Sequence, residues 1–188
     1  MTGDELLEHL RARGALLSGH FLLSSGLHSD RFIQKFRIFE DPPTAEAVGA
    51  ALAERLRPFK PDVVVAAAIG GIIPGYIVAR NLGVRDIFVE KEAGAPALRR
   101  GFKLTRGERV AVVEDVMTTG KSTAEVIGVV EAAGAQIVAI GCIIKRGNPT
   151  FLYPLVTLLD LPLADYTAAA CPQCADGAPL QDPGSRRA

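Results

Sequence analysis

The chain has 188 residues, which fits one domain with a single sizeable core. Its 21 basic and 21 acidic residues balance, which excludes the global positive charge that recruits nucleic acid or anionic membranes. No apolar run is long enough to span a bilayer and no signal-peptide pattern is present, so the expected location is the cytoplasm, where three cysteines would stay reduced.

The first forty residues predict a helix followed by short extended pieces. Thr2 and Glu5 have capping-box spacing, and the leucines that follow mark one helical face, which ends at Gly14. Residues 20–39 are aromatic, rich in serine and punctuated by glycine, which is typical of short strands joined by turns. We therefore expect a small N-terminal unit beside the main sheet.

An alternation of apolar runs and helical segments follows. An alanine-rich helix is predicted from Pro42 to about Arg57, before two prolines that stop it. The later expectations are strands over 63–69, 86–90, 109–116, 136–144 and 155–161, the last at a sheet edge, with helices over 74–81 and 122–133. This alternation predicts an α/β fold with a mostly parallel central sheet flanked by helices. Beyond about Ala170 little is available to bury, so a loose tail is expected.

The stretch 110–122 carries the chemistry. A buried strand ends in Glu114 and Asp115, at the edge where open α/β sheets place ligands. Adjacent carboxylates suit sugar hydroxyls or a metal, and a hydroxyl-rich turn at a helix N-terminus favours phosphate. The predicted ligand therefore carries both sugar and phosphate. The turn and helix start consist of Val116, Met117, Thr118, Thr119, Gly120, Lys121 and Ser122.

Two other interpretations compete with this one. Residues 120–122 resemble the end of a nucleotide-triphosphate P-loop, but that pattern requires glycine where Asp115 stands. A second alternative is that Ser122 and Glu125 form only a capping box, which leaves the acid pair unexplained.

The whole stretch 110–122 resembles the phosphoribosyl diphosphate signature of the type I phosphoribosyltransferases. The resemblance implies that family's fold with a small N-terminal hood, a loop around the ligand 5-phosphate, Glu114 and Asp115 on the ribose hydroxyls, and Mg²⁺ held mainly by substrate rather than by direct protein ligation. Lys121 departs from the glycine often found there.

Residues 19–35 resemble the hood of the orotate phosphoribosyltransferases, which covers the base. This resemblance implies that Phe32, Lys35, Thr118 and Arg146 contact orotate, whose carboxylate suits a guanidinium. It also implies the transfer of a phosphoribosyl group to orotate in pyrimidine synthesis, by a homodimer whose active sites lie at the subunit interface.

Two further segments resemble functional loops of that family. Residues 68–75, including Gly70 and Gly71, resemble its pyrophosphate loop, where small residues let backbone amides approach the leaving group and a cis non-proline peptide is often found. Residues 90–103 stand where the family carries a mobile catalytic loop. Its candidate cations are Lys91, Arg99, Arg100 and Lys103, which could equally form a solvated basic turn.

Cys171 and Cys174 resemble half of a zinc knuckle, and half a knuckle is not a site. A similar ending, with the residues 183–185, occurs in a bacterial subgroup of orotate enzymes. The expected organisation is one catalytic domain over 1–170, with the hood over about 1–40, and a C-terminal tail over 171–188.

Two rival functions remain at this stage. A related transferase could act on a purine or another pyrimidine, although the hood and Arg146 favour orotate. A regulator that senses phosphoribosyl diphosphate and binds nucleic acid would carry an added basic element, which the balanced charge does not support.

Overall fold

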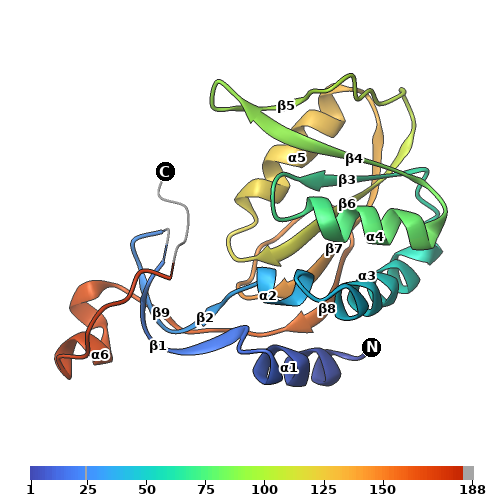
Figure 1. The fold of residues 1–188 in the computed structure, drawn as a ribbon. Coiled ribbons are helices and arrows are strands. Elements are labelled where there is room, and N and C mark those ends of the chain that lie inside the picture. Colours follow the sequence, from blue (N-terminus) through green and yellow to red (C-terminus); the bar gives the residue numbers. More distant parts are fainter. Residues whose placement is uncertain (24, 184–188) are drawn as a thin grey trace.

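The structure, a computed structural model, describes residues 1–23 and 25–183. Its main sheet has six strands in the order β5-β4-β3-β6-β7-β8, and β5 is the one antiparallel member (Figure 1). The strands are β3 (Val63–Ala67), β4 (Arg85–Glu92), β5 (Ala95–Leu98), β6 (Arg109–Met117), β7 (Gln136–Lys145) and β8 (Leu155–Asp160). The predicted α/β fold with a mostly parallel sheet is confirmed, and so is the edge position of the last apolar run.

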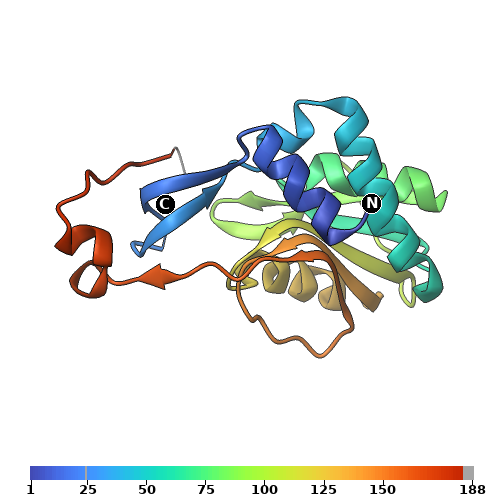
Figure 2. The ribbon, with the colours of Figure 1, turned by 90° about the horizontal axis from the view of Figure 1, so that it is seen from below.

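Helices cover both faces of this sheet, as Figure 2 shows. The helices are α1 (Gly3–Ala12), α2 (Phe36–Phe39), α3 (Pro42–Leu56), α4 (Ile72–Leu82) and α5 (Lys121–Ala132), with a 3-10 turn η1 (Arg57–Phe59) after α3. One apolar cluster joins α1, α3 and α4 to one face of the sheet, and a second joins α5 to the other. Burial on both faces explains why the strands read as continuous apolar runs. The predicted capping box of α1 is present at Thr2 and Glu5.

Two predicted strands end at other residues than expected. The strand expected over 63–69 ends at Ala67. Just beyond it, the peptide between Ala68 and Ile69 is cis, as the resemblance suggested. The segment expected to be a loop over 90–103 instead begins as a hairpin in which β4 pairs with β5. Its turn lies at Ala93 and Gly94, both with positive φ.

The predicted N-terminal unit is a three-stranded sheet that projects from the main body (Figure 1). Its strands are β1 (Leu16–Leu22), β2 (His28–Ile33) and β9 (Asp165–Tyr166), in the order β1-β2-β9. We call this sheet the hood. It thus combines two hairpin strands from the start of the chain with one short strand from near its end.

The expectation of a loose tail was wrong for residues 171–183. The C-terminal segment forms a 3-10 turn η2 (Ala168–Ala170) and a short helix α6 (Pro172–Ala175), and Cys171 is buried. The segment then runs along the hood, where Gln181 exchanges backbone hydrogen bonds with His20 and Leu22. Composition predicted the tail because few apolar side chains are present, but backbone and polar contacts fix it. Residues 184 and 185, also named in the sequence pattern, lie outside the described residues.

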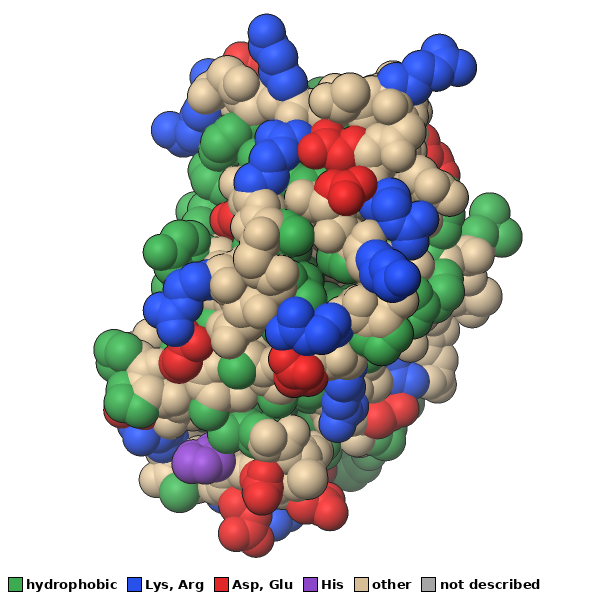
Figure 3. All heavy atoms as spheres, turned by 90° about the vertical axis from the view of Figure 1, so that its right-hand side faces the viewer, with side chains coloured by type: hydrophobic (Ala, Val, Ile, Leu, Met, Phe, Trp, Pro, Cys, Tyr) green, Lys and Arg blue, Asp and Glu red, His purple; other side chains and the backbone are tan. Residues whose placement is uncertain are grey.

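The face of the molecule on the right of Figure 1 carries lysine, arginine, aspartate and glutamate side chains intermingled, without one large patch of either sign (Figure 3). This agrees with the formal net charge of zero. Among the described residues, no helix combines the length and apolar character that crossing a bilayer requires.

Candidate active site

The acid pair lies at the end of β6, in the middle of the sheet. Asp115 is 2% exposed, and its Oδ2 lies 2.6 Å from Nζ of Lys35, which follows the hood strand β2. The other carboxylate oxygen accepts a hydrogen bond from Val116 N–H at 2.6 Å. Glu114 is 7% exposed and accepts a 3.5 Å hydrogen bond from the Thr123 hydroxyl. The strand tip is therefore buried but polar, and the hood supplies its cation.

Burial, together with the negative charge of Asp115, raises the pKa of Glu114 to about 8. The acid pair therefore binds a proton more readily than an isolated carboxylate would. Lys35 beside Asp115 further offsets the negative charge of the strand tip. Such a tip can accept a polyanionic ligand without strong repulsion.

The turn after the strand leads directly into α5. Gly120 has φ 76°, and a Cβ there would lie 2.7 Å from the Phe151 ring and 2.9 Å from Pro149, so this position requires glycine. No side-chain hydrogen bond caps α5. The alternative of a Ser122–Glu125 capping box is therefore wrong, and Glu125 instead pairs with Lys91. The start of α5 retains the backbone N–H groups that favour phosphate.

A cavity of about 600 Å³ opens between this turn and the hood. It brings together Phe32, Lys35, Glu114, Arg146 and the whole turn from Val116 to Ser122, all predicted from the sequence. Sequence reasoning missed four lining residues, Leu23, Ser25, Ile33 and Thr123. The first three lie in or beside the hood strands, but no local pattern shows which hood side chains face the cavity.

Arg146 directly follows β7 and lines the same cavity. Arg146 is 9% exposed, and one terminal nitrogen of its guanidinium donates a 2.9 Å hydrogen bond to Asp165 of β9. Its Nε is buried and has no hydrogen-bond partner among the described residues. Burial lowers the pKa of the guanidinium, although Asp165 opposes this shift. A buried, incompletely paired guanidinium that lines a cavity favours an anionic ligand group.

A second cavity of about 390 Å³ adjoins the first, because Ser122 lines both. Ala68 and Ile69 of the predicted pyrophosphate loop line it, together with Lys91. Gly70 packs against the Asp115 carboxylate, so a side chain at this position would collide with the strand tip. A Cβ at Gly71 would lie 2.8 Å from the Ala67 carbonyl oxygen of β3. Gly70 thus allows the loop to approach the acid pair, and Gly71 allows it to pack against β3.

The remaining candidate cations, Arg99, Arg100 and Lys103, follow β5, at the end of the hairpin away from its turn. Arg99 pairs with Glu92 at 3.2 Å, and Arg100 pairs with Glu90 at 2.9 Å and covers the Phe88 ring. None of Arg99, Arg100 and Lys103 lines either cavity. Within one chain, only Lys91 of the predicted loop cations reaches the candidate site.

Comparison with known proteins agrees with this geometry. Residues 37–153 match the family model described as the phosphoribosyl transferase domain. The chain is 48% identical to the orotate phosphoribosyltransferase of Thermotoga maritima over 181 residues, which cover 95% of this chain and 97% of that protein. It is 46% identical to the orotate phosphoribosyltransferase of Caulobacter vibrioides, with coverage of 100% and 98%.

Solved structures agree as well. The orotate phosphoribosyltransferase of Aeropyrum pernix superposes with a TM-score of 0.68 at 27% identity, over 82% of this chain and 92% of that one. An adenine phosphoribosyltransferase of Thermoanaerobacter pseudethanolicus shares the fold, with a TM-score of 0.59 at 22% identity over 69% and 87% of the two chains. The extent and identity of the sequence matches, on this fold and around this cavity, establish that the chain belongs to the orotate phosphoribosyltransferase family.

Proposed function

We propose that the two adjoining cavities bind phosphoribosyl diphosphate and orotate, and that the chain forms orotidine 5-phosphate and diphosphate there. The observation that carries this proposal is the convergence of Glu114, the turn from Val116 to Ser122 and Arg146 on one cavity. Asp115 lies directly behind this lining, paired with the cavity residue Lys35. Glu114 and Asp115 hold the ribose hydroxyls. The 5-phosphate lies against the N–H groups and hydroxyls of the turn from Val116 to Ser122.

The leaving diphosphate occupies the second cavity in this proposal. The loop at Gly70 and Gly71 borders the acid pair, and Lys91 supplies a positive charge beside the same space. A growing negative charge on the leaving group is best stabilised by cations and dipoles that are already in place. This arrangement puts the diphosphate and the base on opposite sides of the ribose.

The base lies under the hood. The incompletely paired Arg146 faces the orotate carboxylate, and Phe32 and Thr118 line the same cavity. Lys35 joins the base region to the strand tip through its 2.6 Å contact with Asp115. Together these contacts hold the base for in-line attack on the sugar.

The oxygen donors at the strand tip also suit Mg²⁺, a hard cation that prefers carboxylate and phosphate oxygens. Oxygens of the ribose and diphosphate would hold the ion in the main, and Glu114 and Asp115 would fix the ribose beside it rather than ligate it directly. When bound, Mg²⁺ neutralises part of the diphosphate charge. The residues of the chain orient the two substrates and exclude water.

The cations that follow β5 fit a homodimer in which this segment of each chain serves the neighbouring subunit's site. Arg100 and Lys103 lie away from both cavities of their own chain, so a role in catalysis requires a second chain. In this proposal, residues 1–170 form the catalytic domain and residues 171–188 form a C-terminal tail, of which the described part, residues 171–183, braces the hood. We place the enzyme in the cytoplasm, in pyrimidine nucleotide synthesis.

The proposal is tested by mixing the purified chain with phosphoribosyl diphosphate, Mg²⁺ and orotate and following the ultraviolet absorbance of the base. Loss of orotate should require both the sugar diphosphate and Mg²⁺. Adenine, hypoxanthine and uracil are the matched comparison bases, and turnover of any of these in preference to orotate would overturn the base assignment.

A further inference from the structure

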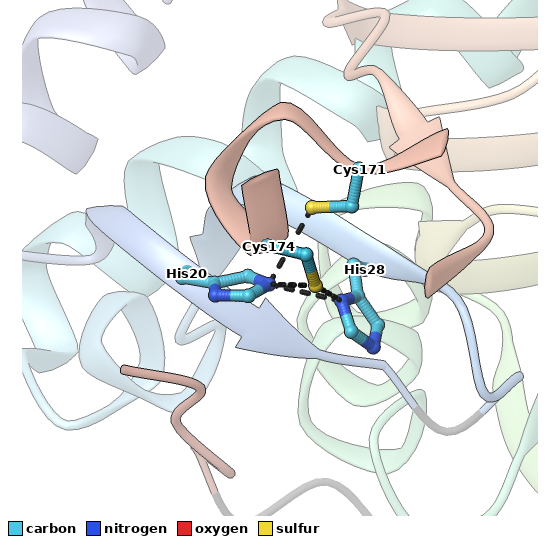
Figure 4. Close-up of side chains that lie close together, drawn as sticks. All are labelled: His20, His28, Cys171 and Cys174. Atoms are coloured by element: carbon cyan, nitrogen blue, oxygen red, sulfur yellow. Dashed lines mark hydrogen bonds between the residues drawn. The ribbon is translucent and has the colours of Figure 1, made fainter. Parts of the chain in front are cut away.

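Four potential metal ligands meet beneath the hood, far from the acid pair. His20 lies on β1, His28 on β2, Cys171 at the end of η2 and Cys174 in α6 (Figure 4). One side-chain ligand atom from each residue lies within 4.8 Å of the others. His20, His28 and Cys171 are buried, whereas Cys174 is exposed and leaves the cluster open to solvent on one side.

The orientation of His20 matches that of a metal ligand. Its Nδ1 lies 2.9 Å from the Ala178 carbonyl oxygen, which can only accept, so Nδ1 carries the proton. The other ring nitrogen, Nε2, faces the cluster and lies 2.9 Å from His28 Nδ1, 3.4 Å from Cys171 Sγ and 3.6 Å from Cys174 Sγ. Histidines that bind metals typically fix their tautomer by just such a hydrogen bond to a carbonyl.

The spacing of the four atoms fits a tetrahedral zinc ion. With Zn–N bonds of about 2.0–2.1 Å and Zn–S bonds of about 2.3 Å, a tetrahedral site separates its ligand atoms by roughly 3.3–3.8 Å. The contacts to His20 Nε2 span 2.9–3.6 Å, and Cys174 Sγ lies 3.3 Å from His28 Nδ1. A small outward movement of the two imidazoles would therefore accommodate the ion.

The ligand chemistry selects the metal. Two thiolates and two imidazoles favour Zn²⁺ over Mg²⁺ or Ca²⁺, which prefer oxygen. Two thiolates would also balance the charge of Zn²⁺, so the buried site would be neutral. We propose that His20, His28, Cys171 and Cys174 form a closed structural zinc site that fastens the C-terminal segment to the hood.

Such a site would stabilise a part of the molecule that has little core of its own. Phe21 and Leu23 are buried in the hood but belong to neither main apolar cluster. The hood also carries Phe32, which lines the substrate cavity, and β9 carries Asp165, which binds Arg146. Zinc beneath the hood therefore acts on the base-binding wall without touching the substrates, in the way that structural zinc stabilises small units elsewhere.

The direct test is metal analysis of the full chain, produced without a histidine tag and dialysed. We expect about one zinc per chain, and we expect most of it to be lost in Cys171→Ser, Cys174→Ser and His20→Ala. The chain offers matched controls, because its third cysteine and third histidine lie outside the cluster. Cys142→Ala in β7 and His9→Gln on the exposed face of α1 should both keep the zinc.

A second measurement needs no variant. The zinc-free chain titrated with Co²⁺ should develop the intense visible bands of a tetrahedral ion and the near-ultraviolet bands of cobalt–thiolate bonds. Saturation should occur at about one equivalent. Zinc removal should raise the KM for orotate several-fold more than the KM for phosphoribosyl diphosphate.

Three results would overturn the proposal. The first is wild-type chain that binds neither zinc nor cobalt while its thiols are reduced. The second is zinc that persists when both Cys171 and Cys174 are replaced. The third is a Cys171–Cys174 disulfide, seen as a mass lower by two hydrogens, that re-forms in the presence of zinc and thiol reductant.

Discussion

Lys35 connects the hood side of the candidate site to the acid pair on β6. It leaves the hood strand and places Nζ 2.6 Å from the buried Asp115 carboxylate, while Gly70 packs against the same pair. Residue chemistry at the strand tip could be predicted because the acids and the turn are contiguous in sequence. The ion pair between Lys35 and Asp115 depends on how the hood folds back over the sheet, and no local pattern contains that information.

Arg146 gives the sharpest test of base recognition. Arg146→Ala should raise the KM for orotate by roughly 10- to 100-fold, because a charge-assisted contact with the carboxylate is lost. The effect on kcat should be smaller. Arg146→Lys keeps the charge but not the planar donor fork, so its KM for orotate should lie between those of the unaltered chain and Arg146→Ala. Steady-state kinetics with each substrate varied would expose a different role if only the KM for phosphoribosyl diphosphate rose.

Asp86 makes stability depend on pH. Burial raises its pKa from the ordinary value of 3.8 to about 7, and its Oδ1 is buried without a hydrogen-bond partner among the described residues. The folded state thus holds this proton more tightly than the unfolded state does. Its contribution to stability is complete below pH 4 or so and is lost as the pH rises through about 7.

Asp86→Asn should therefore flatten the fall in the free energy of unfolding between about pH 5 and pH 8. Urea unfolding at several pH values measures the slope. Asp4→Asn, at an exposed position in the first turn of α1, is the control and should leave the slope unchanged. A slope in Asp86→Asn equal to that of the unaltered chain would show that Asp86 does not titrate in this range.

The β4–β5 hairpin was only partly predicted from the sequence. The strand 86–90 was predicted from its apolar residues, but the continuation to Glu92 and the return strand β5 contain charged and small residues. Pairing across the hairpin, rather than side-chain pattern, extends them. The C-terminal segment behaves similarly, since its place is fixed by contacts with residues roughly 150 positions earlier.

Lys91 decides whether this hairpin takes part in catalysis. Lys91→Ala should lower kcat by roughly 10- to 100-fold, because a cation beside the leaving group is lost. Stability should change little, since an exposed ion pair contributes about 0–1 kcal/mol. Glu125→Gln breaks the same 3.2 Å pair but keeps the lysine, so it should lose far less activity. Equal losses in the two variants would mean that the pair only stabilises structure.

In the molecule as a whole, the mostly parallel sheet and its flanking helices followed from the alternation of apolar runs and helical segments. The order of the strands was not predicted. The arrangement of hood, C-terminal segment and any second subunit did not follow, since these depend on contacts between distant or separate segments. Neither His20 nor His28 looks like a ligand until the fold brings both to Cys171 and Cys174.

A mixing experiment tests the proposed dimer. One variant, Asp115→Asn, damages the strand tip, and the other, Arg100→Ala with Lys103→Ala, removes two cations of the segment that follows β5. If this segment acts on the neighbouring site, equal mixing after reversible dissociation should restore about a quarter of full activity, since half the dimers are mixed and each has one intact site. Activity that stays at the level expected from the two separate variants would place each segment at its own site.

The claim on which the rest depends is that the acid pair and the turn bind the phosphorylated sugar. Calorimetric titration of phosphoribosyl diphosphate with Mg²⁺ measures this directly, first into the unaltered chain and then into Asp115→Asn. We predict saturable binding by the former and a loss of at least roughly 10-fold in affinity in the latter, since a charged hydrogen-bond acceptor is removed. Unchanged affinity in a folded Asp115→Asn, or no binding by the unaltered chain, would contradict the account.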